Sequence, residues 1–393
     1  MRKSALLALG LVVTALVALG LVILSSASEA NAMRLHHGDA LFFMKRQSLY
    51  LVVGIAIAAT LAKIDYHVFR RYPLLVWLGF AIVVALMVAV LAFPPIKGSR
   101  RWIPLGIMNL QPSELAKLMV VMVTATWLDK IAWRVELFWR GAVCSGLFVG
   151  VLVALAVCEP DFGAAMVIGL AGALVMIVAG VRFWRHMVPL GLLGGAAVLP
   201  ILMTNANRMA RMSAFFGFKI DVGVEVLDKA ADNAAYQGHQ ALVAIMNGGL
   251  WGVGLNKSMQ KHYYLPEAHT DMIFPIGAEE LGLVFSIGTV LLFCAFFALS
   301  VYIAAKAADR FGRFLALGMS FIIFYQAMFN IGVVCEALPM KGMALPFFSY
   351  GGTNMLSAFT AVGMILSVGI HSLRDPQRMF ARRKMNVRVR SHG

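Results

Sequence analysis

Charged residues are scarce in this chain of 393 residues. Asp, Glu, Lys and Arg make up 13% of it, whereas an ordinary soluble domain has about 25%. Hydrophobic residues make up 61%. Since each membrane-spanning helix needs about 20 mainly apolar residues, this composition excludes a soluble globular protein and predicts a polytopic membrane protein.

Several other features are missing. The 4 cysteines are dispersed, and no CxxC pair or metal-ligand spacing occurs, so neither a disulfide framework nor a zinc site is indicated. Carboxylates in the middle of apolar runs are almost absent, which argues against a proton-relay pump. No internal repeat is evident, which argues against a transporter built from inverted repeats.

Ten apolar stretches predict an all-α polytopic membrane protein with about ten transmembrane helices. The first is too long for the apolar core of an ordinary signal peptide, so we expect it to be retained. The fourth and fifth are the shortest and have polar ends. The stretches cover residues 5–25, 48–63, 74–93, 113–128, 141–157, 163–180, 186–203, 281–304, 313–334 and 352–371.

The distribution of Lys and Arg predicts the orientation. With a cytoplasmic N-terminus, cytoplasmic segments hold 20 of these residues and short external loops hold 7, so both termini are expected in the cytoplasm. We expect one transmembrane domain, residues 1–373, and a basic cytoplasmic tail, residues 374–393, suited to anionic lipid rather than nucleic acid. One long external loop, about 204–272, connects spans seven and eight. It includes a candidate amphipathic helix at 236–246.

Polar residues gather on the external side in this topology. Glu114 and Lys117, at positions i and i+3, can pair on one helical face, either to fix the helix end or to serve a site. Asp161 can cap the sixth span or bind a divalent cation together with Glu159. The four polar segments are residues 97–117, 159–163, 262–280 and 339–353.

The third segment holds the densest group of ionisable residues, Leu-Pro-Glu-Ala-His-Thr-Asp at 265–271. Charges at a membrane edge are costly to keep without a use, so Asp271 is the leading candidate for chemistry. The fourth segment has two prolines and three glycines between residues 339 and 352. It predicts a broken or re-entrant backbone, which a membrane tolerates only inside protein or along a cavity.

Together these segments resemble the shape, elongation, division and sporulation (SEDS) family. The resemblance covers nearly the whole chain. Within the family, residues 258–271 are more similar to the division branch (FtsW) than to the elongation branch (RodA). The matching motifs lie at residues 97–103, 111–117, 159–163, 265–271 and 345–352.

The resemblance implies a peptidoglycan glycosyltransferase of the bacterial cytoplasmic membrane, acting at the division septum. It would join lipid II units into glycan strands on the outer face and release undecaprenyl diphosphate. Asp271 would be the general base for the acceptor sugar 4-hydroxyl. Arg101 or Lys117, with a divalent cation such as Mg²⁺ or Mn²⁺, would stabilise the diphosphate. The other expected substrate contacts are Glu114, Lys261, Glu267 and His269.

His269 could instead orient Asp271 or be purely structural, and Glu267 could brace the loop. The family also implies a class B penicillin-binding transpeptidase and other divisome proteins as partners, besides membrane lipid. Three alternatives remain: a lipid II flippase, a scaffold for the transpeptidase, and an elongation-type or sporulation-type polymerase. The sparse charge in the spans argues against the flippase.

The chain departs from the family pattern at three places. It has Asn256 and Lys257 where Gly-Asn is usual, and Glu336 where a Gly is usual. In the long loop, the basic residues lead to residues 215–218 rather than to a proline. These changes concern loop geometry and partner contacts and leave Asp271 untouched.

Overall fold

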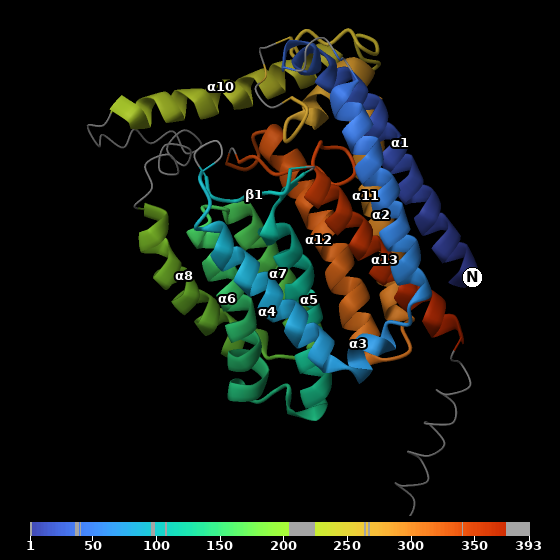
Figure 1. Ribbon diagram of the computed structural model, residues 1–393, viewed down its shortest axis with the longest axis vertical. Coiled ribbons are helices and arrows are strands. Elements are labelled where there is room, and N and C mark those ends of the chain that lie inside the picture. Colours follow the sequence, from blue (N-terminus) through green and yellow to red (C-terminus); the bar gives the residue numbers. More distant parts are fainter. Residues whose placement is uncertain are drawn as a thin grey trace, which may run out of the picture.

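The computed structural model describes residues 2–35, 39, 41–95, 99–106, 108–203, 225–262, 265, 268–339 and 341–374. Long helices run side by side as a bundle, and one helix, α10, lies across one end of it (Figure 1). The elements are α1 (Arg2–Leu35), α2 (Phe42–Lys63), α3 (His67–Arg71), α4 (Pro73–Val90), β1 (Ile103–Pro104), β2 (Asn109–Leu110), α5 (Pro112–Ile131), η1 (Ala132–Arg134), η2 (Phe138–Val143), α6 (Cys144–Cys158), α7 (Phe162–Ala179), η3 (Phe183–Met187), α8 (Val188–Met203), α10 (Glu225–Gly248), α11 (Ile273–Ala305), α12 (Arg310–Val334) and α13 (Gly352–Arg374).

Among the described residues, 8 helices are long and apolar enough to cross a membrane. They match the first, second, third, fifth, sixth, eighth, ninth and tenth predicted spans. The fourth and seventh coincide with α5, whose ends are charged, and with α8, which has 16 residues. The multi-pass α-helical fold is therefore confirmed, while the total of ten spans and their orientation stay predictions.

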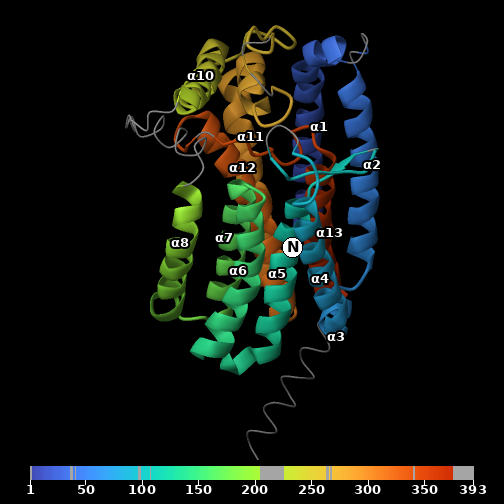
Figure 2. The ribbon, with the colours of Figure 1, turned by 60° about the vertical axis from the view of Figure 1, so that its left-hand side comes forward.

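Helices α12 and α13 form the centre of the bundle. In their most apolar windows, 67% and 78% of the residues are buried, against 22% for α4. α13 packs along α2, and α12 contacts α11, α5, α7 and α13 (Figure 2). The peripheral helices keep apolar side chains exposed on their outer faces, as a membrane-spanning bundle requires.

Polar and imino residues set the ends of several central helices. Pro112 starts α5, where its missing N–H costs nothing. Asp161 caps α7 by accepting a hydrogen bond from the Ala164 amide (3.3 Å), which confirms the capping interpretation of this residue. At the other end of the bundle Asp309 caps α12, accepting from the Gly312 amide at 2.7 Å.

Helix α11 is broken at Gly282, whose φ of 73° lies in the left-handed region. The loop that follows α10 passes directly against this break: a side chain on Gly282 would overlap the backbone of Gly252. The Leu283 amide donates to the Gly249 carbonyl at 2.9 Å. The eighth span, predicted from residue 281, therefore begins at a real interruption of a helix that itself starts at Ile273.

Two departures from the family pattern are explained by backbone conformation. Asn256 and Glu336 both stand where the family usually has glycine, and both have positive φ, 63° and 54°. Asn tolerates this region best among residues with a side chain, whereas Glu has a higher conformational energy there. The third departure, at residues 215–218, lies outside the described residues.

The segment between α12 and α13 is irregular and buried, as predicted. Leu345, Phe347, Phe348 and Ser349 are all fully buried within protein. By contrast, the helix expected at residues 236–246 is longer than predicted, since α10 covers Glu225–Gly248. Residues 204–224 of the long loop and 375–393 of the tail lie outside the described part of the chain.

Candidate active site

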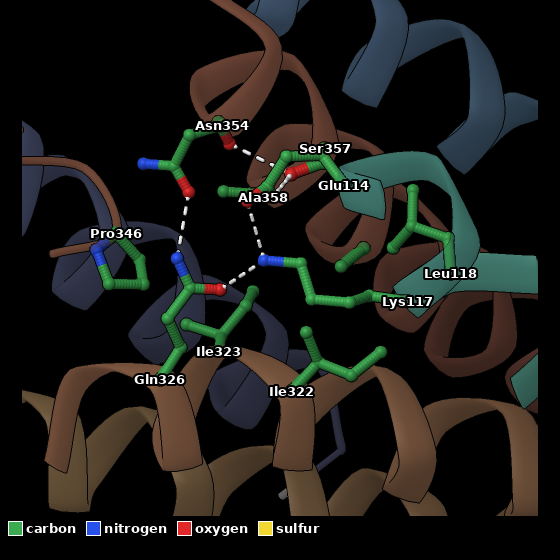
Figure 3. Close-up of a pocket in the computed structure, with 11 residues that line it drawn as sticks. Glu114, Lys117, Leu118, Ile322, Ile323, Gln326, Pro346, Asn354, Ser357 and Ala358 are labelled. Carbon is green, nitrogen blue, oxygen red and sulfur yellow. Dashed lines mark hydrogen bonds and ion pairs between the residues drawn. The ribbon is translucent and has the colours of Figure 1, made fainter. Parts of the chain in front are cut away.

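Glu114 and Lys117 form the predicted ion pair on α5. Their side-chain Oε1 and Nζ atoms are 2.7 Å apart, and the two residues are 6% and 2% exposed. Lys117 Nζ also donates to Gln326 Oε1 of α12 at 2.7 Å, while Ser357 Oγ of α13 donates to Glu114 Oε2 at 3.0 Å (Figure 3). The pair therefore ties three helices together through charge-assisted hydrogen bonds.

Gln326 extends this network towards the irregular segment. Its Nε2 donates to Asn354 Oδ1 at 3.0 Å and to the Ala344 carbonyl at 2.8 Å. The cavity enclosed by these groups measures about 10 Å³, room for about one water molecule. A sugar does not fit in it. In this conformation the Glu114–Lys117 pair is therefore too deeply buried for a large substrate to contact it.

Asp271, two residues before α11, contacts α12 one helical turn beyond Gln326. Asn330, four residues after Gln326, donates from Nδ2 to the Asp271 main-chain carbonyl at 2.8 Å and to the Met343 carbonyl at 2.6 Å. Thr270 Oγ1 donates to Asp271 Oδ1 at 2.9 Å. The residue is half-buried. Its backbone is thus fixed from inside the protein, while the residue as a whole remains partly exposed.

Gly342 leaves the space that the Asp271 carboxylate occupies. A Cβ atom on Gly342 would overlap Asp271 Oδ2. The two motifs that the sequence separates, 265–271 and 339–353, are therefore in direct contact at the candidate base. The sequence offered no sign of this contact beyond the glycine itself.

The irregular segment also holds the residues before Asp271. Ser349 Oγ donates to the Thr270 carbonyl, and the Tyr350 amide donates to the His269 carbonyl at 2.9 Å. The His269 ring packs against the Phe43 ring, with centroids 4.7 Å apart. This placement supports a structural role for His269 at least, and its expected action on Asp271 stays a prediction.

Arg101 precedes β1, and its side chain contacts the turn between α6 and α7. Its guanidinium donates to the main-chain carbonyls of Glu159, at 3.3 Å, and of Pro160. Arg101 does not line the cavity beside Glu114 and Lys117, and neither does Asp271. Glu114 and Lys117 thus lie in a different cluster from Arg101 and from Asp271, and a common external cavity for the four residues stays a prediction.

Asp161 connects these clusters. Its Oδ2 accepts from Gln111 Nε2 at 2.9 Å and from Ser113 Oγ at 3.2 Å, and its Oδ1 is 3.7 Å from Lys341 Nζ. Burial opposes its ionisation, but the charges of Lys341, Arg101 and Lys117 and the hydrogen bond from the Ala164 amide together hold its pKa below the ordinary value. Lys341, next to Gly342, is thus a cation of the site that the sequence reasoning missed.

Glu159 is fully buried, and among the described residues neither of its carboxyl oxygens has a hydrogen-bond partner. Burial, with a smaller contribution from the Asp161 charge, raises its pKa to about 8. Glu159 is therefore protonated at neutral pH. The described residues bring no group of three or more His, Cys, Asp or Glu together that could hold a metal ion, so the divalent cation stays a prediction without a ligand set.

Lys261 lies in a separate buried cluster beside the break in α11. Its Nζ is 3.3 Å from Glu280 Oε1 and 2.9 Å from Ser26 Oγ, and it also contacts Asn256 Oδ1. The residue is 4% exposed. This placement supports a bracing role between α1, α11 and the loop, and substrate binding by Lys261 stays a prediction. Glu267 lies outside the described residues.

Sequence reasoning also missed four uncharged polar residues, Gln326, Asn330, Asn354 and Ser357. All four come from apolar helices, α12 and α13. The available signal was weak but real: Gln326 and Asn330 are four residues apart, so they lie on one helical face. Uncharged polar residues in a span pair across helices.

Comparison with known proteins identifies the family of this chain. The model of the family FTSW_RODA_SPOVE, described as cell cycle protein, matches residues 7–373. A "Probable peptidoglycan glycosyltransferase FtsW" from Thioalkalivibrio sulfidiphilus is 39% identical over 92% of this chain and 88% of its own. One from Geobacter sp. (strain M18) is 36% identical, over 88% and 92%.

Two solved structures share the fold. A chain from "Structural coordination of polymerization and crosslinking by a peptidoglycan synthase complex" is similar with a TM-score of 0.71 and 25% identity, covering 93% of this chain and 98% of its own. Thermus thermophilus Rod shape determining protein RodA is similar with a TM-score of 0.63 and 25% identity, covering 92% and 95%. This chain therefore belongs to the FtsW/RodA/SpoVE family of cell cycle proteins.

Proposed function

We propose that this protein is a peptidoglycan glycosyltransferase that joins lipid II into glycan strands at the outer face of the cytoplasmic membrane. The FtsW relatives, named as peptidoglycan glycosyltransferases, support the activity. The observation that carries the assignment to a site is the position of Asp271. Asp271 is a partly exposed residue, and Asn330, Ser349 and Tyr350 hold the backbone of residues 269–271 in place.

In the proposed reaction the acceptor sugar 4-hydroxyl oxygen attacks the anomeric carbon of the donor. The bond from that carbon to the diphosphate oxygen breaks, and undecaprenyl diphosphate leaves with the electron pair. Asp271 takes the hydroxyl proton, a contribution of about 10²–10⁴-fold for a positioned base. The clamped backbone suits this role, since a fixed geometry lowers the cost of reaching the transition state.

The diphosphate requires positive charge as it leaves. Arg101 and Lys117 were expected to supply it, but Arg101 binds two carbonyls and Lys117 is paired with Glu114. Lys341 adjoins Gly342, the residue in contact with the Asp271 carboxylate, and its Nζ lies 3.7 Å from Asp161 Oδ1. We therefore add Lys341 to the candidates for the leaving group. Lys117 would not contact the substrate; its ion pair with Glu114 would keep α5, α12 and α13 rigid beside the site.

The division septum is the proposed place of action, and a class B penicillin-binding transpeptidase is the proposed partner. FtsW-named relatives support the first. The second is supported by the similar chain from a complex whose name couples polymerization with crosslinking. Other divisome proteins are expected neighbours on the same grounds.

A purified chain incubated with lipid II tests this function, alone and with its transpeptidase partner. We expect glycan strands on a gel, with more product when the partner is present. Proteoliposomes provide the matched test for transport. If labelled lipid II crosses the bilayer while no strands form under any condition, the protein is a flippase and the proposal is wrong.

A further inference from the structure

The triplet Phe-Trp-Arg occurs twice in the chain, at residues 138–140 and 183–185. Each copy begins a π-helical turn, η2 or η3, directly before an apolar helix, α6 or α8. The two turns contact each other, and the Phe138 ring packs edge-on against the His186 ring with centroids 5.2 Å apart. Two copies of one motif, distant in sequence, are thus neighbours in space.

Both tryptophans of these twin triplets face outwards. Trp139 is 72% exposed and Trp184 is 81% exposed, although both adjoin apolar spans. An indole with one apolar face and one polar N–H is most stable at the boundary between acyl chains and headgroups. The twin triplets therefore mark the level of a membrane surface at this end of the bundle.

The arginines of the triplets are exposed and have no acidic partner among the described residues. Arg182, next to the second triplet, is different, because it pairs with Glu136 at 2.7 Å. Trp127 Nε1 donates to the Arg140 carbonyl at 2.9 Å. This hydrogen bond fixes the η2 turn through the main chain of Arg140 and does not involve the Arg140 guanidinium. Within the described part of the chain, Arg140 and Arg185 are thus two cations without an acidic partner, beside two exposed indoles.

This end of the bundle is opposite to the candidate active site. Helix α6 starts after η2 and ends at Cys158, immediately before the buried Glu159 and Asp161 of the site. With Asp271 on the outer face, the twin triplets lie at the cytoplasmic leaflet. The leaflet that carries anionic lipid attracts basic residues beside a span.

We propose that the twin triplets form a binding site for an anionic glycerophospholipid of the cytoplasmic leaflet. Arg140 and Arg185 bind the lipid phosphate, for which the planar guanidinium supplies paired donors. Trp139 and Trp184 contact the glycerol and the upper acyl chain. The two spans enter the bilayer directly after the turns that carry the arginines. The guanidinium groups therefore lie at the level of the lipid headgroups, which makes a lipid phosphate a better-placed partner than an acidic protein segment.

Competitive lipid binding tests the proposal on the full-length protein. Detergent-solubilised protein is given equal amounts of phosphatidylglycerol and phosphatidylcholine, and bound lipids are counted by native mass spectrometry. We compare the Arg140→Gln/Arg185→Gln double variant with Arg71→Gln/Arg313→Gln, which removes two exposed arginines from the same end outside the triplets. An Arg140→Lys/Arg185→Lys variant keeps the charge and removes the guanidinium forks.

The native protein and the Arg71/Arg313 control should prefer phosphatidylglycerol. The glutamine double variant should lose this preference, roughly fivefold for each arginine removed, while the lysine variant loses part of it. Equal loss in the control would overturn the site in favour of diffuse charge attraction. An unchanged preference in a monodisperse glutamine variant would also overturn it, and would leave the surface to an acidic protein segment.

Discussion

Gly342 and the Asp271 carboxylate are in direct contact in the candidate site. A methyl group at residue 342 would meet a carboxylate oxygen at the end of a short side chain, which can turn away. The fold should therefore survive the change while the base is displaced.

Gly342→Ala should lower the polymerisation rate by about 100-fold, the cost typical of an ångström-scale misplacement of a reacting group. The thermal midpoint and the affinity for lipid II should stay near their native values. Gly150→Ala is the control, because a Cβ there meets no atom within 4 Å. Native activity in Gly342→Ala would show that the carboxylate position is not limiting.

Glu159 gives the site a pH dependence of defined sign. Its folded-state pKa, about 8, is above the ordinary 4.5 because burial and Asp161 disfavour its ionisation. The folded protein thus binds more protons than the unfolded chain between these values, so stability is present at low pH and is lost as pH rises towards 8.

Glu159→Gln removes this loss, which amounts to at most about 5 kcal/mol. We expect the thermal midpoint of the native protein to fall, relative to the variant, between pH 5 and pH 8. Glu336→Gln, which removes an exposed carboxylate, is the control. Parallel melting curves for native protein and Glu159→Gln across this range would contradict the account.

At the scale of helices, the sequence predicted where the helices lie, but it did not predict the contacts between them. Apolar runs identified helices at all ten expected positions because burial in lipid demands them. The break in α11 at Gly282 was not predicted, because it depends on tertiary contacts with Leu250 and Gly252, which are remote in sequence. The Glu114–Lys117 pair was predicted from its spacing, but its partners Gln326 and Ser357 are remote in sequence and unreadable from it.

The end of α12 carries a residue in an unfavourable conformation. Glu336 has φ 54° directly after the helix, where the family usually has glycine. Glu336→Gly should stabilise the protein by up to about 1 kcal/mol, since relief of the left-handed strain outweighs the added freedom of the unfolded chain. A rise in thermal midpoint measures this. Cys335→Gly, at φ −89°, should give no gain, and equal effects of the two changes would refute the explanation.

Variants of the ion pair that joins α5, α12 and α13 can distinguish its effect on stability from its effect on activity. Lys117→Met leaves Glu114 buried and unmatched, which should cost about 3–5 kcal/mol. The double variant Glu114→Gln/Lys117→Met should recover most of the thermal midpoint. If the pair also shapes the site, polymerisation stays low in the double variant. Recovery of activity together with stability would reduce the pair to a structural role.

At the scale of the molecule, three motif clusters meet at one end of the bundle. Asp161 joins Gln111, Ser113 and Lys341, and Asn330 joins Asp271 to the irregular segment. Sequence order alone placed these motifs on one membrane side, yet it could not distinguish one shared cavity from adjacent clusters. The distinction depends on which face each helix turns to its neighbours.

The central claim is that Asp271 acts as the base rather than as a substrate anchor. The most direct test measures turnover and lipid II affinity in the same samples of native protein, Asp271→Asn and the surface control Asp39→Asn, each with the transpeptidase partner. We predict that Asp271→Asn loses about 10²–10⁴-fold in turnover at saturating lipid II, with unchanged affinity, while Asp39→Asn keeps both. Native turnover in Asp271→Asn, or a loss confined to affinity, would contradict the account.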